Sequence, residues 1–234
     1  MNLTSPALVR AHLLFAFLSL ACGAPALRAV PGGPDLARFQ IPATDDGLPG
    51  AGPIRRADWF KNLWVERRTS FAGDVQRDQG ALVFLGDSIT QGWGDVGSSF
   101  PGIKVANRGI SGDTTRGVLI RLKEDVLSVN PKGVVLLIGT NDIEENAEPE
   151  VIGANVKLIV DALKAHDPKM PVVLCEIFPS SESMKRPRAK IWRTKELYKS
   201  LGVDEPQVTL LDTWSLFGNA LVSLRNHGAL PLVG

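Results

Sequence analysis

Ser88 stands at a point in the sequence where a hydroxyl group could do chemistry. It follows an apolar run and a Gly-Asp pair in the stretch FLGDSITQGWG, residues 84–94. A serine presented at the end of a buried strand can act as a nucleophile toward a carbonyl carbon. Alternatively, Asp87 or Ser88 could cap the following helix, because a side-chain oxygen there accepts a hydrogen bond from a free backbone N–H. This stretch alone leaves both interpretations open.

Two further turns carry the residue types that acyl transfer needs. Asn-Arg-Gly-Ile-Ser-Gly follows the second expected strand, and Gly-Thr-Asn-Asp follows the third. The backbone N–H groups of Ser88 and Gly109 and the side-chain amide of Asn141 would supply three donors to an oxyanion. Gly109 could instead be an ordinary turn glycine, and Asn141 a helix cap. Because all three turns follow strands, their combination favours an acyl-transfer site.

A serine nucleophile needs a base, and the three histidines of the chain leave one candidate. His12 lies in the N-terminal segment considered below. His166 precedes the fourth expected strand, which places it at the edge of the sheet opposite Ser88. His227 is therefore the candidate base. Since seven residues follow it, a terminal residue without a role is the alternative.

The elements that must position these residues alternate between strands and helices. Short apolar runs predict five strands, several of them continuously hydrophobic, as in a parallel sheet covered on both faces. These runs are 81–85, 103–106, 133–138, 172–177 and 208–211. Helices are expected over 58–73, 114–129, 149–165 and 187–201, with Asp113 and Pro149 suited to helix starts. The result is an α/β sandwich in which the three turns lie at the carboxyl ends of strands, where ligands bind.

Regular structure is expected to begin at Asp58. The preceding residues 27–57 are rich in proline and glycine and show no sustained period, which predicts a linker or a strap laid over the surface. Residues 58–234 are then one domain, long enough to bury a core.

The three stretches carry a family resemblance. FLGDSITQGW, NRGISGDTT and LLIGTND resemble the first three signature blocks of the SGNH (GDSL) hydrolase superfamily, over residues 81 to about 214. Thr90 distinguishes the first block from the G-x-S-x-G of α/β-hydrolases. The resemblance implies a three-layer, flavodoxin-like sandwich with Ser88 as nucleophile and an oxyanion hole from Ser88, Gly109 and Asn141. It also implies ester hydrolysis without a metal or organic cofactor.

The resemblance further suggests a class of substrate. The subgroup with GDSITQGW and GTND is similar to acetylhydrolases that act on acetylated sugars or lipids. Small acyl esters, acetyl esters in particular, are therefore the expected substrates. Trp93 is a candidate to line the acyl pocket, although a tryptophan beside a turn can equally be simple packing.

The fourth block departs from the family pattern. That pattern ends in Asp-x-x-His and a further helix, whereas the only candidate here, SLRNHGALPLVG, has leucine at position 224. Gly228 and Pro231 also oppose a final helix. We therefore expect residues 217–234 to be poorly packed and the chain to be a truncated or altered relative of an active esterase.

The missing acid leaves two questions of function. Asp212, Asp87 and Glu176 are the candidates to orient His227 in its place. If none does so, the protein is a non-catalytic binding domain that keeps the oxyanion loops and has lost its base. Weak turnover at best is the expectation.

Composition and charge exclude several other functions. The chain is 44% hydrophobic and 22% charged, as in a soluble globular protein. Without residues 1–26 it keeps 25 of its 26 basic residues and all 25 acidic ones, so its net charge is zero. That balance and a single basic cluster at 184–190 do not indicate nucleic-acid binding. Cys175, the one cysteine beyond this segment, is expected in the core, and no Cys/His cluster has metal-ligand spacing.

Residues 1–26 predict a secretory signal peptide. A short polar start precedes an apolar stretch at 11–20, and GAPALRA supplies small residues for cleavage near position 24, 26 or 29. The apolar stretch is shorter than the roughly 20 residues of a membrane span. Lipidation at Cys22 is not expected, because no leucine stands three residues before it. The mature protein should be secreted or periplasmic.

Exported protein is expected to lack residues 1–26. Intact-mass measurement of protein recovered from the periplasm or medium should give a chain that begins close to position 27. A mass that includes the segment from Met1 would contradict the signal peptide.

Overall fold

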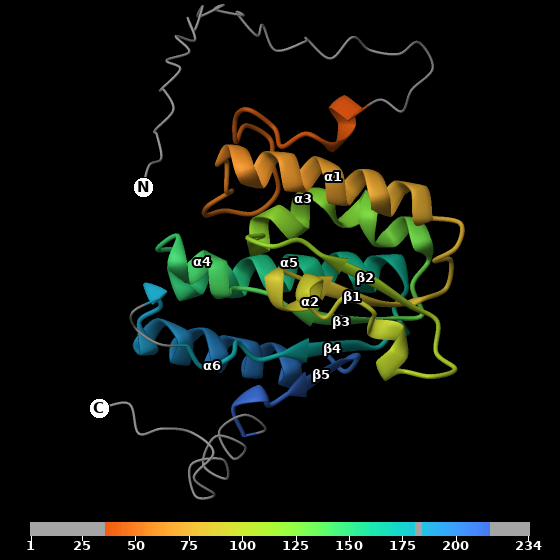
Figure 1. Ribbon diagram of the computed structural model, residues 1–234. Helices are drawn as coiled ribbons and strands as arrows, with labels where there is room; N and C mark the ends of the chain where they lie inside the picture. The colour runs from red at the N-terminus through yellow and green to blue at the C-terminus, as the bar shows by residue number, and fades with distance from the viewer. Residues whose placement is uncertain (1–35, 181–183, 216–234) are drawn as a thin grey trace, which may run out of the picture. The chain divides into compact units, whose positions relative to one another are not determined.

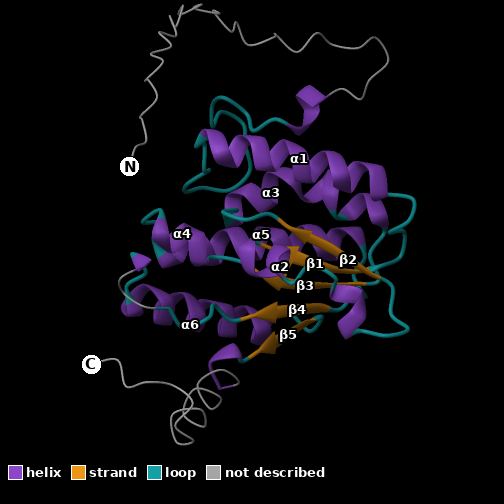
Figure 2. Ribbon diagram, in the orientation of Figure 1, coloured by secondary structure: helices purple, strands orange, loops and turns teal. Residues whose placement is uncertain are grey.

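The predicted strands form one parallel sheet in the computed structural model, which describes residues 36–180 and 184–215 (Figure 1, Figure 2). The strands are β1 (Leu82–Gly86), β2 (Val105–Gly109), β3 (Gly133–Leu137), β4 (Val172–Cys175) and β5 (Val208–Leu211). Their order is β2-β1-β3-β4-β5, and every pair is parallel. The predicted fold class is confirmed. Because the strand order reverses beside β1, a crevice is expected at the carboxyl ends of the central strands.

The helices also follow the sequence pattern closely. They are α1 (Asp58–Asp74), α2 (Ser88–Gly92), α3 (Thr115–Asp125), α4 (Thr140–Glu144), α5 (Pro149–His166) and α6 (Arg188–Asp204). Short 3-10 helices are η1 (Leu36–Phe39), η2 (Val96–Ser99) and η3 (Leu127–Val129). Thr114, rather than Asp113, caps α3, since its hydroxyl accepts from Gly117 N at 3.2 Å. No helix of the described residues is long and apolar enough to cross a membrane.

Helices α3, α5 and α6 cover one face of the sheet, where the main core lies. Alternate strand residues point into it, and Leu85, Leu136 and Leu174 are 0% exposed there. On the other face, α2 and η2 bring Trp93 and Phe100 onto Phe84, with ring centroids 5.2 to 5.9 Å apart. Helical segments thus lie on both faces, but the described ones cover the α2 face only in part, because strand side chains such as Leu137 and Val173 line a groove there.

Part of the proline- and glycine-rich segment lies on the domain. Ala51 N donates to Asn155 Oδ1 at 3.1 Å, and Asn155 Nδ2 donates back to Ala51 O at 2.8 Å. Thr114 Oγ1 donates to Pro53 O at 2.9 Å, and Phe39 is buried. Residues 36–57 thus form a strap over α3 and α5 that ends where α1 begins.

Buried polar contacts tie together the turns at the carboxyl ends of β2 and β3. Both carboxylate oxygens of Asp142 accept from Thr115 N at 3.0 to 3.1 Å, and Asp142 Oδ1 lies 2.5 Å from the Thr115 hydroxyl oxygen. Burial raises the pKa of Asp142 to about 7, against the lowering effect of these hydrogen bonds. The turn after β3 is therefore held to the start of α3.

Arg121 makes a second tie, between β1 and the turn after β2. Its Nε lies 2.8 Å from Asp113 Oδ2 and its Nη1 lies 3.7 Å from Asp125 Oδ2, and all three side chains are nearly or fully buried. Its Nη2 donates to Gly86 O, just before Asp87, at 3.3 Å. A buried arginine thus links the end of β1 to the loop that follows β2.

Arg121→Met should destabilise the fold by about 3 to 5 kcal/mol, because it leaves two buried carboxylates without this counter-charge. Urea unfolding at neutral pH measures the effect. Lys157→Met removes an exposed ion pair with Asp161 on α5 and should change stability little. Equal effects of the two substitutions would show that the buried pair does not hold these turns.

Asp142→Asn should make the free energy of unfolding less sensitive to pH. The pKa of about 7 in the folded protein exceeds the unfolded value of about 3.9, so between these values the folded state binds more protons. The wild-type protein should therefore lose stability relative to the variant as pH rises from 4 to 7, by up to about 1.4 kcal/mol per pH unit, and no further above 7. Parallel pH profiles of the two proteins would refute this.

Candidate active site

The structure resolves the two interpretations of the Gly-Asp-Ser turn. Asp87 is the cap of α2, and its Oδ1 accepts from Ile89 N at 3.0 Å. Ser88 is the first residue of α2 and is exposed. Its hydroxyl has no hydrogen-bond partner among the described residues. Because Asp87 satisfies the helix end, the Ser88 hydroxyl is left available for chemistry.

The glycine before this pair has a steric reason. A Cβ at Gly86 would collide with Leu137 O on β3 and with the Thr90 side chain. Only glycine lets the chain pass between β3 and α2 here, so Ser88 emerges directly at the end of β1.

Two of the expected oxyanion donors are free to act. Ser88 N–H is at the first position of α2, where a helix offers no internal acceptor. Asn141 is 4% exposed, and one hydrogen of its Nδ2 is donated to Asp113 O at 2.8 Å. The second hydrogen has no acceptor among the described residues.

The third expected donor, Gly109, is already engaged. Its N–H donates to Asn107 Oδ1 at 2.9 Å, and its carbonyl accepts from Arg67 Nε at 3.1 Å. Both groups therefore form contacts at the outer edge of β2. Its assignment to the oxyanion hole stays a prediction that requires the Asn107 contact to break.

Gly112, in the same turn, is a candidate donor that the sequence reasoning missed. Its φ is +88°, and a Cβ there would collide with the Trp59 ring. Its N–H has no acceptor among the described residues. It directly precedes Asp113, whose carbonyl binds Asn141. The signal in the sequence is the second glycine of NRGISGD.

The candidate base cannot be placed, because His227 lies outside the described residues. Of the acids expected to orient it, Glu176 is buried and lies 3.0 Å from Lys195 Nζ. Asp212 is exposed and accepts from Ser215 N at 3.0 Å and from Ser215 Oγ at 2.6 Å. These hydrogen bonds hold the pKa of Asp212 well below its usual range.

Asp87, the third acid, lies next to the nucleophile in sequence but is 1% exposed. Burial raises its pKa to about 6, and the charge of Asp113 adds to this effect. Its Oδ2 is buried without a hydrogen-bond partner in the described residues.

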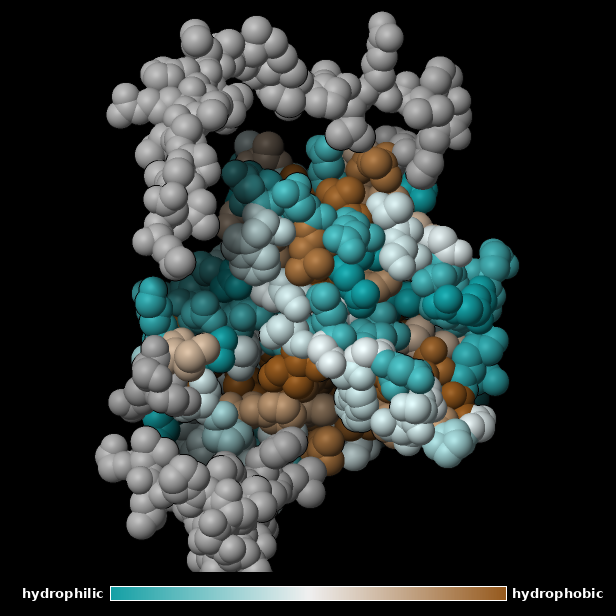
Figure 3. Space-filling model, viewed as in Figure 1, coloured by the Kyte–Doolittle hydropathy of each residue, from teal (hydrophilic) through white to brown (hydrophobic). Residues whose placement is uncertain are grey.

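An apolar groove of about 490 Å³ lies beside the nucleophile on the α2 face of the sheet. Its floor consists of strand side chains, and its walls include Ile89, Thr90 and Trp93, which follow Ser88 along the chain. Figure 3 shows hydrophobic side chains gathered in a hollow of this face. Trp93 both lines the groove and packs on Phe84, and its part in an acyl pocket stays a prediction.

Comparison with solved structures supports the fold. A GDSL-like lipase from Bacteroides thetaiotaomicron matches with a TM-score of 0.52 and 24% identity, over 63% of this chain and 78% of that one. A lipase/acylhydrolase from Enterococcus faecalis matches with a TM-score of 0.51 and 21% identity, over 59% and 78%.

Sequence comparison connects the chain to named relatives and to a family. Platelet-activating factor acetylhydrolase IB subunit alpha2 of Homo sapiens is 32% identical over 176 residues, 72% of this chain and 75% of that protein. The alpha1 subunit of Pongo abelii is 31% identical over 171 residues, 70% and 72% of the two chains. The GDSL-like Lipase/Acylhydrolase family matches residues 84–229. The protein therefore belongs to the GDSL-like lipase/acylhydrolase family, of the SGNH type.

Proposed function

We propose that this protein is an exported serine esterase that hydrolyses small acyl esters, acetyl esters above all, of carbohydrates or lipids. The observation that carries the proposal is the exposed Ser88 hydroxyl, left without a partner because Asp87 caps α2. Family membership supports ester hydrolysis. The acetyl preference rests on the mammalian relatives, which are named acetylhydrolases.

In the proposed reaction, Ser88 Oγ adds to the ester carbonyl carbon while a base removes its proton. The carbonyl oxygen becomes an oxyanion, which accepts hydrogen bonds from Ser88 N–H, Asn141 Nδ2–H and one glycine N–H of the turn after β2. Collapse of this intermediate expels the alcohol and leaves an acyl-enzyme. Water then adds to the acyl carbon, and a second collapse releases the acid and restores Ser88.

His227 is the proposed base. Leucine occupies position 224, where the family has an acid, so another carboxylate must orient the imidazole. Of the three acids only Asp212 is exposed, whereas Glu176 and Asp87 are buried. Hydrogen bonds from Ser215 lower the pKa of Asp212, so its carboxylate is charged at neutral pH. Asp212 therefore fits this task better than the other two.

The second candidate function is a non-catalytic binding domain. The specific observation in its favour is the same Leu224, since a histidine without its acid is a weak general base. In that case the free donors around Ser88 would bind an acyl or carboxylate group without turning it over.

Purified protein should hydrolyse p-nitrophenyl acetate weakly, and Ser88→Ala should abolish that activity because the nucleophile is lost.

Asn141→Ala should lower kcat by about 10²-fold or more with little change in KM, because its hydrogen bond forms with the oxyanion. His227→Ala should reduce kcat if the terminal segment supplies the base.

Ser200→Ala is the matched control, because this exposed serine bonds only within α6 and should leave the rate unchanged. Unchanged kcat in Asn141→Ala would contradict the oxyanion hole. A fluorophosphonate probe separates the two functions, since it labels an activated Ser88 and not a serine without a base. Robust hydrolysis that is lost in His227→Ala would refute the expectation that the altered fourth block permits only weak turnover.

A further inference from the structure

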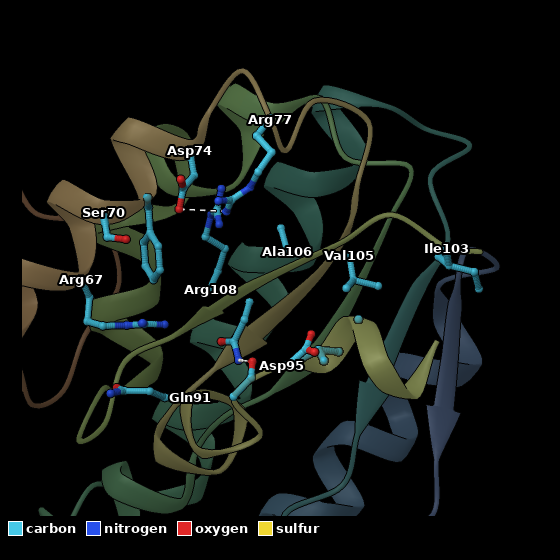
Figure 4. A pocket seen from close by; sticks show the side chains of 15 residues that line it. Arg67, Ser70, Asp74, Arg77, Gln91, Asp95, Ile103, Val105, Ala106 and Arg108 are labelled. Carbon is cyan, nitrogen blue, oxygen red and sulfur yellow. Dashed lines mark hydrogen bonds and ion pairs between the residues drawn. The ribbon is translucent and has the colours of Figure 1, made fainter. Parts of the chain in front are cut away.

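A second cavity, of about 480 Å³, runs along the outer edge of β2, between α1 and the segment after α2 (Figure 4). Gln91 of α2 also lines this cavity. None of the lining residues is shared with the apolar groove beside Ser88. Its walls are mainly polar and charged, in contrast to that groove. The role proposed for Ser88 leaves this cavity unexplained.

Arg67 points into the cavity from α1 (Figure 4). Its Nε donates to Gly109 O at 3.1 Å, and its guanidinium lies 4.8 Å from the centre of the Phe71 ring, which holds the group in place. Nη1 and Nη2 of Arg67 form no ion pair and no hydrogen bond with any described residue. A positioned arginine therefore presents four N–H donors to the cavity.

Two carboxylates near the cavity are paired with other arginines. Asp78 lies 2.8 Å from Arg108 and 2.9 Å from Arg77, and Asp74 lies 2.9 Å from Arg77. Partial burial lowers the pKa of Arg67, and the positive charges of Arg121 and Arg108 add to this effect, while the neighbouring Glu66 opposes it. It nevertheless stays charged at neutral pH.

Asp95 is the remaining carboxylate in the lining, and its Oδ1 accepts from Ser98 N at the start of η2, at 3.3 Å. It lies across the cavity from the α1 wall that carries Arg67 (Figure 4). Neither of the carboxylates that line the cavity, Asp74 and Asp95, is therefore paired with Arg67.

Gln91 adds a donor on the same side. Its Oε1 accepts from Ser111 N at 2.6 Å, which fixes the amide and leaves both hydrogens of Nε2 without an acceptor in the described chain. Gln91 and Arg67 both contact Gly109, since a Cβ there would collide with Gln91 N while Arg67 binds its carbonyl. The exposed Ser70 hydroxyl, one turn after Arg67 on α1, also lines the cavity.

We propose that this cavity binds the oxyanion group, a phosphate or a carboxylate, of a small molecule, with Arg67 as its principal ligand. The Arg67 fork matches two oxygens of such a group, and Gln91 Nε2 supplies a further donor. Apolar surface from Phe71, Ile103 and Val105 accommodates the rest of the molecule. The site is independent of Ser88 chemistry.

Isothermal titration with inorganic phosphate and, separately, with citrate tests the proposal, with chloride keeping the ionic strength constant. At least one of the two should bind saturably, and the tighter one identifies the preferred group. Arg67→Gln should weaken that binding tenfold or more. Arg193→Gln is the matched control, because it removes an exposed arginine paired with Glu150 on another part of the surface, and should leave the affinity unchanged.

Gln91→Glu is a second variant that spares the fold. Glutamate keeps the acceptor for Ser111 N–H but replaces the Nε2 donor with a negative oxygen, so it should also weaken the binding tenfold or more. Ser88→Ala should bind the anion as the wild type does, which separates this site from the esterase proposal. Absence of saturable binding by either probe, or equal affinity in Arg67→Gln and Arg193→Gln, would overturn the inference.

Discussion

A single buried residue, Asp113, connects the carboxyl ends of three strands. Its carboxylate pairs with Arg121, which donates to Gly86 O at the end of β1. Its carbonyl accepts from Asn141 after β3, and its own turn follows β2. Taking this ion pair out of water is costly, and an apolar replacement would often be as stable. What the pair provides is position, since it fixes the turns that carry the candidate nucleophile and donors relative to one another.

The meeting of three polar turns at one edge of the sheet follows from local rules, which is why the sequence predicts it. Continuous apolar runs require a covered parallel sheet, and a parallel sheet brings the turns after β1, β2 and β3 to one edge. The sequence does not show whether Asp87 or Ser88 caps the helix, because both residue types are good N-caps. In the structure the N-cap residue of α2 is Asp87.

The remaining features depend on contacts between distant residues. The sequence does not show which of Gly109 and Gly112 has a free N–H, whereas in the structure the Asn107 side chain occupies the N–H of Gly109. Arg67 reads as one charge among several on α1, a helix whose apolar and polar residues do not separate sharply. That it binds the Gly109 carbonyl and has no ion pair with a described residue becomes visible only when α1 is placed against β2.

The turn after β2 contacts Arg67 of the second cavity at one end and carries the candidate donor Gly112 at the other. Arg67 holds the carbonyl of Gly109 from the outer edge of β2, and three residues later the same turn presents the free N–H of Gly112. On the far side of Gly109, Ile110 N donates to Gly86 O at 3.1 Å and Ser111 N donates to Gln91 Oε1 at 2.6 Å. Asp113 anchors the end of the turn through Arg121 and Asn141. The residues on both sides of Gly112 are therefore held by hydrogen bonds to other elements, and this fixes the position of its free N–H.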